Sequence, residues 1–290
     1  PKEAAPFFEK LLDDDPDNLE VLEVLYDIYL ETDQPTDFLR VAERCGALVE
    51  DEETKIKIYR RMAAELQTDD ALRLRAADVL EKIIEIDPQN EVTYRELEEI
   101  YIKEEAWDEL VTCYRRHAAA EEVPPVRCEI LRALAAVLDE KLDDPKAAVE
   151  TLDEAVEADG ENLPTLVYLS ALLERLENWV PLADVLSKRA ELTTEESERV
   201  ELHRRIGEIA LEKMGDAEAA EERLMKALEL DPENAGAMMA LVTLYRNREE
   251  WLRAANMLAD AEQATGNRLE KARLLFEAGE IHREHLEDMD

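Results

Sequence analysis

The chain contains little glycine and few aromatic residues. Its 290 residues include 7 glycines and 11 prolines, and aromatic residues make up 5%. No two glycines lie closer than eight residues, which excludes a glycine-rich loop that binds phosphate groups. Alanine, leucine, glutamate and arginine are abundant and β-branched runs are few, which favours helix. The sequence therefore predicts an all-α protein.

Cysteine, serine and long apolar runs are also scarce. No stretch approaches 18 apolar residues, which excludes a membrane-spanning helix. Cys45, Cys113 and Cys128 do not recur at a regular spacing, so we expect small buried side chains in a reducing, cytoplasmic compartment. None of the three serines lies in a nucleophile-elbow motif. We predict no enzyme activity and no cofactor.

Basic residues are outnumbered by acidic ones. The 35 basic and 73 acidic residues give a net charge of −38, which argues against binding to nucleic-acid phosphates and to anionic membrane surfaces. Three explanations of the charge stay open. They are solubility of an elongated stack, a basic protein partner at the acidic outer face, and adaptation to high salt.

One turn motif recurs every 72 residues. It reads Asp-Pro-x-Asn or Asp-Gly-x-Asn at Asp15–Asn18, Asp87–Asn90, Asp159–Asn162 and Asp231–Asn234. A fixed period is typical of stacked supersecondary units, and such a stack grows without dividing into separate cores. We therefore predict a single array over residues 1–290, with repeats 15–86, 87–158, 159–230 and 231–290 and a partial repeat 1–14. Because no polar capping helix is evident at either end, we expect a fragment of a longer protein.

Each repeat is predicted to contain two helical hairpins, which gives about 16 helices in the chain. After Asn90, the apolar residues Tyr94, Leu97 and Tyr101 follow the spacing of an amphipathic helix. The asparagine of each turn stands at the N-cap position, where its side-chain oxygen accepts hydrogen bonds from unpaired backbone N–H groups. The same columns are apolar in the other repeats, so the hairpin is expected to recur.

Two further columns recur with the period. Trp107, Trp179 and Trp251 are 72 residues apart, and Pro35 stands at the equivalent position of the first repeat. We expect the indoles to pack between helices; a stacking surface for ligands is the alternative. Small residues recur where two helix backbones are expected to approach closely, at Ala63, Ala135, Gly207 and Gly279.

The third repeat carries a family pattern. His203-x2-Ile206-Gly207-x2-Ala210, followed by Ala220-x3-Leu224 and Pro232, matches the spacing of the tetratricopeptide repeat, with one residue more between the helices. The whole chain resembles a degenerate tetratricopeptide array with a 72-residue double-hairpin period. The resemblance implies a right-handed α-solenoid of stacked antiparallel hairpins. It also implies that the first helix of each hairpin lines a concave groove for a peptide or protein segment.

A row of arginines occupies the columns that would face this groove. They are Arg60, Arg95, Arg132 and Arg204, and Phe276 follows in the last repeat. Guanidinium groups bind carboxylates bidentately, so an acidic or carboxyl-terminal peptide is the expected ligand. The alternative is that each arginine pairs with a glutamate on an adjacent helix.

The resemblance therefore implies a non-catalytic protein–protein interaction scaffold. The alternatives are a regulatory or targeting module of a larger enzyme and a structural protein that assembles end to end through uncapped helices. His282 and His285 are three residues apart with glutamates nearby, a spacing that permits a pair of metal ligands. No other repeat contains this pair, and no metal site is predicted.

Overall fold

The computed structural model describes residues 3–286. Over these residues the chain forms 16 α-helices and no strand, which confirms the predicted fold class and the expected number of helices. The chain divides into two compact bodies, the N-terminal body of residues 1–158 and the C-terminal body of residues 159–290. The division falls between two 72-residue repeats.

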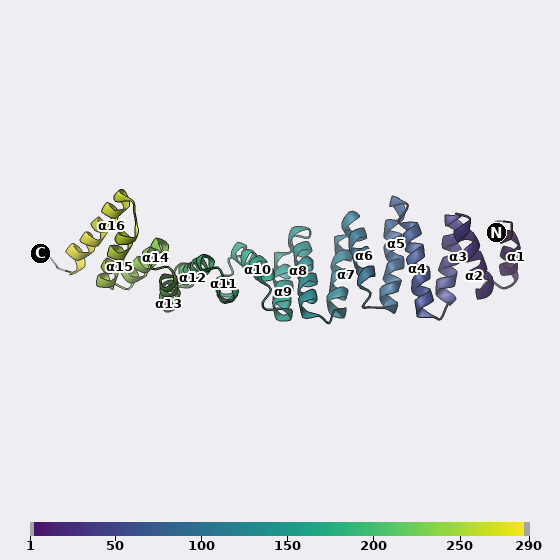
Figure 1. Ribbon diagram of the computed structural model, residues 1–290, viewed down its shortest axis with the longest axis horizontal. Helices are drawn as coiled ribbons and strands as arrows, with labels where there is room; N and C mark the ends of the chain where they lie inside the picture. Colours follow the sequence, from purple (N-terminus) through teal and green to yellow (C-terminus); the bar gives the residue numbers. More distant parts are fainter. Residues whose placement is uncertain (1–2, 287–290) are drawn as a thin grey trace. The chain divides into compact units, whose positions relative to one another are not determined.

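In each body, consecutive helices pack against one another as antiparallel neighbours (Figure 1). The N-terminal body contains α1 (Ala5–Asp14), α2 (Leu19–Glu31), α3 (Pro35–Leu48), α4 (Glu52–Leu66), a 3₁₀ turn η1 (Asp70–Leu72), α5 (Arg73–Ile86), α6 (Glu91–Lys103), α7 (Trp107–Ala120), α8 (Pro124–Glu140) and α9 (Pro145–Ala158). The C-terminal body contains α10 (Leu163–Arg175), α11 (Trp179–Leu192), α12 (Glu196–Ile209), a π-helical turn η2 (Ala210–Met214), α13 (Ala217–Leu230), α14 (Ala235–Asn247), α15 (Trp251–Ala264), α16 (Arg268–Ile281) and a second π-helical turn η3 (His282–Leu286).

The recurring asparagines cap the first helix of each repeat, as predicted. The Asn90 side chain accepts a hydrogen bond from the Thr93 backbone N–H at 3.2 Å and donates one to Asp87 at 2.8 Å. The aspartate of the turn therefore orients the amide that caps the helix. Asn18, Asn162 and Asn234 cap α2, α10 and α14 in the same way.

The turn between the first and second helix of each repeat contains a residue with positive φ. These residues are all acidic: Asp33, Glu105, Glu177 and Glu249, with φ between 51° and 59°. Backbone hydrogen bonds close the turn, as in the 2.9 Å bond from the Ala106 N–H to the Tyr101 carbonyl. Glycine is the residue that favours this conformation. Because these positions hold acidic residues, the sequence did not predict a positive φ there.

Small residues allow close contact between the third and fourth helices of a repeat. Ala135 of α8 and Ala148 of α9 are fully buried. At the equivalent position of α12, a Cβ on Gly207 would lie 2.6 Å from Leu224 Cγ of α13, so only glycine fits without rearrangement. A Cβ on Gly279 of α16 would have no such neighbour among the described residues.

The three tryptophans lie where the second and third helices of a repeat meet, and they are half-buried. The Lys141 ammonium is 5.3 Å from the centroid of the Trp107 ring, and Lys213 of η2 lies 5.1 Å from that of Trp179. In the last repeat His285 of η3 stacks on Trp251 at 3.7 Å. The indoles thus pack between helices, and a lysine ammonium group or an imidazole ring lies against one face of each indole.

Candidate partner-binding surface

An exposed stripe of mixed character runs along α6. Val92, Arg95, Glu99 and Ile102 are three or four residues apart and share one face of the helix. All four are exposed, Val92 by 54% and Ile102 by 46%. The opposite face of α6 is buried in the core, and the Asn90 cap holds its first turn. The stripe therefore presents two apolar side chains on either side of a pair of charges, on a well-anchored helix.

Arg95 is the most accessible of the predicted groove arginines in the N-terminal body. Its side chain is 69% exposed and forms an ion pair with Glu91 one turn earlier on the same helix. An exposed pair with this spacing contributes only about 0.3–0.5 kcal/mol. A carboxylate from another molecule can therefore compete with Glu91 for the guanidinium group.

Arg60 of α4 is engaged within the fold. One of its terminal nitrogens donates to Asn90 Oδ1 and to Thr93 Oγ1, both at 3.2 Å. Its Nε is buried and has no hydrogen-bond partner among the described residues. Arg60 thus joins the third helix of one repeat to the N-terminus of the next first helix. Arg132 of α8 is half-buried and forms no ion pair with another described residue.

The predicted groove residues of the C-terminal body differ in their accessibility. Arg204 of α12 is 23% exposed and pairs with Glu201 and Glu208 of its own helix. Hydrogen bonding of the Arg204 guanidinium group to the Glu201 carboxylate is the main cause that raises the pKa of Arg204. Phe276 of α16 is 64% exposed, and Leu269 on the same helix is 81% exposed. This body therefore presents apolar rather than cationic side chains at the last of the predicted positions.

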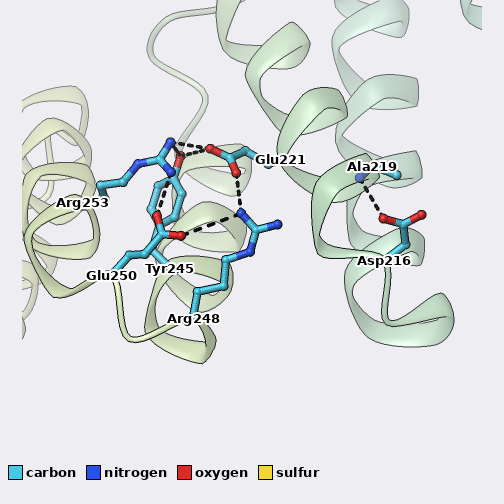
Figure 2. A network of polar contacts seen from close by, with 7 residues as sticks. All are labelled: Asp216, Ala219, Glu221, Tyr245, Arg248, Glu250 and Arg253. Atoms are coloured by element: carbon cyan, nitrogen blue, oxygen red, sulfur yellow. Dashed lines mark hydrogen bonds and ion pairs between the residues drawn. The ribbon is translucent and has the colours of Figure 1, made fainter.

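A polar network joins α13 to the two helices that follow it (Figure 2). Glu221 accepts hydrogen bonds from the Tyr245 hydroxyl at 3.2 Å and from Arg248 at 2.7 Å. Arg253 also donates to Glu221, pairs with Glu250 at 2.7 Å, and lies 4.0 Å from the centroid of the Tyr245 ring. Burial is the main cause that raises the pKa of Tyr245 to about 12. These charges stabilise the fold.

Similar links join the fourth helix of one repeat to the next first and second helices in the N-terminal body. The partners are Glu9 with Tyr29 and Arg40, and Glu81 with Tyr101 and Arg116. In each case a tyrosine hydroxyl donates a hydrogen bond to one half-buried glutamate, and an arginine supplies the opposite charge. The alternative for the groove row was that each of its arginines pairs with a glutamate on an adjacent helix. Such pairs form at Arg40 and Arg116, which do not belong to that row.

The cysteines are buried, as the sequence predicted. Burial raises the pKa of the Cys45 thiol to about 11 and that of Cys113 to about 12. Both thiols are therefore protonated at neutral pH and are poor nucleophiles. His117 stacks on Tyr94 with ring centroids 4.2 Å apart, and burial lowers its pKa.

Within residues 3–286 no helix combines the length and apolar character that a membrane span requires. No group of three or more His, Cys, Asp or Glu side chains in that range is placed to hold a metal ion.

Consecutive antiparallel hairpins that each pack on the next define an α-solenoid of helical repeats. Residues 205–234, which run from α12 through α13 to the next N-cap, match the tetratricopeptide repeat family. The chain is an α-solenoid of helical repeats and contains a segment that is similar to a tetratricopeptide repeat. No curated protein sequence matches it.

Solved structures with a similar fold are distant in sequence. The structure of Naa15/Naa10 bound to HypK-THB is 16% identical with a TM-score of 0.50, and the match covers 93% of this chain and 40% of that one. YrrB, described as a TPR protein with an unusual peptide-binding site, is 17% identical with a TM-score of 0.35 and coverages of 82% and 98%. Pseudomonas aeruginosa pilF is 18% identical with a TM-score of 0.37 and coverages of 67% and 90%.

Two surface features escaped sequence analysis. The α6 stripe could have been found from the sequence. The helical spacing places Val92 and Ile102 on the same face as Arg95, and the apolar core residues of α6 lie on the opposite face. The second feature is a set of crevices between helices. Their linings combine residues from three helices, so no pattern within a single helix predicts them.

Proposed function

We propose that the chain is a non-catalytic scaffold that binds an acidic or carboxyl-terminal peptide segment in the concave groove of the array. The α6 stripe is the observation that carries this proposal. Arg95 supplies a guanidinium group for a carboxylate, and Val92 and Ile102 supply apolar contacts on either side. A peptide of about ten extended residues is longer than the 13-residue helix α6, so it would also reach neighbouring helices.

The other predicted groove residues have supporting roles in this proposal. Arg60 positions the N-terminus of α6 through Asn90, Arg132 has a guanidinium group without an ion pair among the described residues, and Arg204 pairs only within its own helix. Phe276 offers an exposed aromatic contact in the C-terminal body.

A displayed library of random peptides with free carboxyl termini tests the proposal. Selection on the full chain should enrich peptides that combine a carboxylate with an apolar side chain. Arg95→Glu should weaken their binding at least about tenfold, because a charge-assisted hydrogen bond contributes about 1.5–3 kcal/mol. Lys146→Glu, an exposed charge reversal on α9, is the matched control and should leave binding unchanged.

Other outcomes would contradict the groove. Equal binding to wild type and to Arg95→Glu would remove the α6 stripe from the site. Enrichment of lysine-rich and arginine-rich peptides would instead favour a basic partner at the acidic outer surface.

Self-association is a second candidate, which the apolar side chains of α16 favour. Leu269, Leu275 and Phe276 are 81%, 56% and 64% exposed. Several large apolar side chains exposed on one helix are typical of an interaction surface. Light scattering at increasing concentration should then give a rising mass that Phe276→Glu abolishes. A constant monomer mass would eliminate this candidate.

A further inference from the structure

A crevice of the same kind lies in each of three repeats of the described part of the chain. Each copy lies between the second and fourth helices of a repeat and has the third helix at its base. The copies are the α3–α5 crevice of about 560 Å³, the α7–α9 crevice of about 310 Å³ and the α11–α13 crevice of about 330 Å³. Several lining positions are 72 residues apart, so the side chains at those positions can be compared directly between the copies.

The α11–α13 crevice has a basic lining that its neighbour lacks. It contains Arg199 and His203 of α12 together with Arg223 and Lys226 of α13, and all four are half-buried. At the equivalent positions the α7–α9 crevice has Arg127, Leu131, Thr151 and Glu154. In a chain with 73 acidic and 35 basic residues, four basic side chains around one hollow oppose the general charge.

This positive charge is only partly compensated by the protein. The side chains of Arg199 and Arg223 form no ion pair or hydrogen bond with another described residue. Lys226 pairs with Glu222 at 2.7 Å in an exposed contact. The two carboxylates that line the crevice, Glu191 and Glu229, are exposed to solvent at its edge.

His203 is a second indication that the crevice is positively charged. Its Nδ1 is buried and has no hydrogen-bond partner among the described residues. Burial lowers the pKa of His203, and the charges of Arg223, Lys226 and Arg199 lower it further. A neutral imidazole beside three cations offers an N–H donor, and a bound anion would supply the missing negative charge.

We propose that the α11–α13 crevice binds a phosphoryl group carried by a serine or threonine of a partner protein. A phosphoryl group has a charge of about −1.5 to −2 and three acceptor oxygens, which matches two guanidinium groups and an ammonium group better than a single carboxylate does. Arginine presents a planar fork to such oxygens. The crevice contains none of the predicted groove residues, and this proposal does not depend on the proposed function.

Binding should change the titration of His203. The groups that line the crevice with it are Arg199, Arg223, Lys226, Glu191 and Glu229. A dianion among them favours the charged imidazolium, so the pKa of His203 should rise on binding. A purely structural role for the arginines would leave this pKa unchanged.

The experiment is an NMR titration of the histidine ring signals of the full chain. The probes are a short phosphoserine peptide, the same peptide with glutamate in place of phosphoserine, and inorganic phosphate. The phosphoserine peptide should shift the His203 signals and raise its pKa, and His117 should not respond. The double variant Arg223→Thr, Lys226→Glu should weaken binding at least tenfold; these residues already occur at the equivalent positions of the α7–α9 crevice, so the fold accommodates them.

Arg127→Ala, in the neighbouring crevice, is the matched control and should bind as wild type does. Inorganic phosphate should compete with the phosphoserine peptide, and weaker binding of phosphate alone would support a protein-borne group. Equal binding of the glutamate peptide would overturn the preference for a dianion. The absence of any His203 shift, or an undiminished shift in the double variant, would overturn the site.

Discussion

Two crevices at equivalent positions in the two bodies have different chemistry. The α7–α9 crevice is lined by a mixture of basic, apolar and acidic side chains, whereas the α11–α13 crevice has four basic ones at the same positions. Their shapes are similar because caps, turns and small contact residues recur every 72 residues. The difference teaches that the recurring columns determine the scaffold and that the other columns determine what a repeat can bind.

The largest expected effect is a loss of stability on replacing the recurring tryptophans. It tests whether these tryptophans stabilise the two bodies equally. Trp107→Ala in the N-terminal body and Trp179→Ala in the C-terminal body should each cost about 2–3 kcal/mol. This is below the usual 3–5 kcal/mol for a fully buried aromatic residue, because both indoles are half-buried. Chemical unfolding followed by circular dichroism measures the cost.

The exposed neighbour Val180 supplies the control, since Val180→Ala should leave the unfolding midpoint nearly unchanged. Costs that differ by more than about 1 kcal/mol between the two tryptophans would break the equivalence. An unaltered midpoint for both would contradict their packing role.

A smaller effect is expected at the turn before the fourth helix. Asp143 and Gly215 are 72 residues apart and have φ of 52° and 67°. Asp143→Gly should stabilise the N-terminal body and Gly215→Asp should destabilise the C-terminal body, each by about 0.5–1 kcal/mol, because glycine avoids the steric cost of this conformation. Thermal melting measures both changes. Shifts of the same sign would show that the two turns are not interchangeable.

The smallest expected effect is a change in the pH dependence of stability. It depends on His203, which lines the α11–α13 crevice and has a leucine at the equivalent position of the α7–α9 crevice. The pKa of His203 is lowered from 6.5 in the folded chain, so below about pH 6.5 the unfolded chain binds a proton that the folded chain does not. The contribution of His203 to stability is therefore intact above that pH and is lost as the pH falls through the folded pKa. His203→Leu, the residue of the α7–α9 crevice, should make the melting temperature less sensitive to acid between about pH 7 and 5.

His117 remains in both proteins, and burial also lowers its pKa, so only the difference between the melting curves reports on His203. Identical pH dependence in wild type and variant would show that the imidazole is not perturbed by the crevice.

Local features were predictable and long-range partners were not. The caps at Asn90 and Asn234 followed from the turn motif, because a cap involves residues only three apart. Arg60 was expected in the groove, yet it bonds to Asn90 and Thr93, which are 30 and 33 residues away. A period in the sequence reveals that a column recurs but not which neighbouring helix a long side chain reaches. The groove arginines accordingly stay a prediction.

His203 shows the same limit. In the sequence it stands out only as part of the repeat pattern, because a single histidine does not indicate which residues will surround it in the fold. The basic side chains beside it come from two helices that meet only in the folded C-terminal body.

The sequence by itself determined the period, the all-helical class, the capping residues and the resemblance of one segment to a tetratricopeptide repeat. These depend on amphipathic spacing and on hydrogen bonds between residues near each other in the chain. Tertiary structure alone decided which arginines are engaged and which face solvent. It also gathered Arg199, His203, Arg223 and Lys226 around one crevice, because the field at a site is the sum of charges brought together by packing.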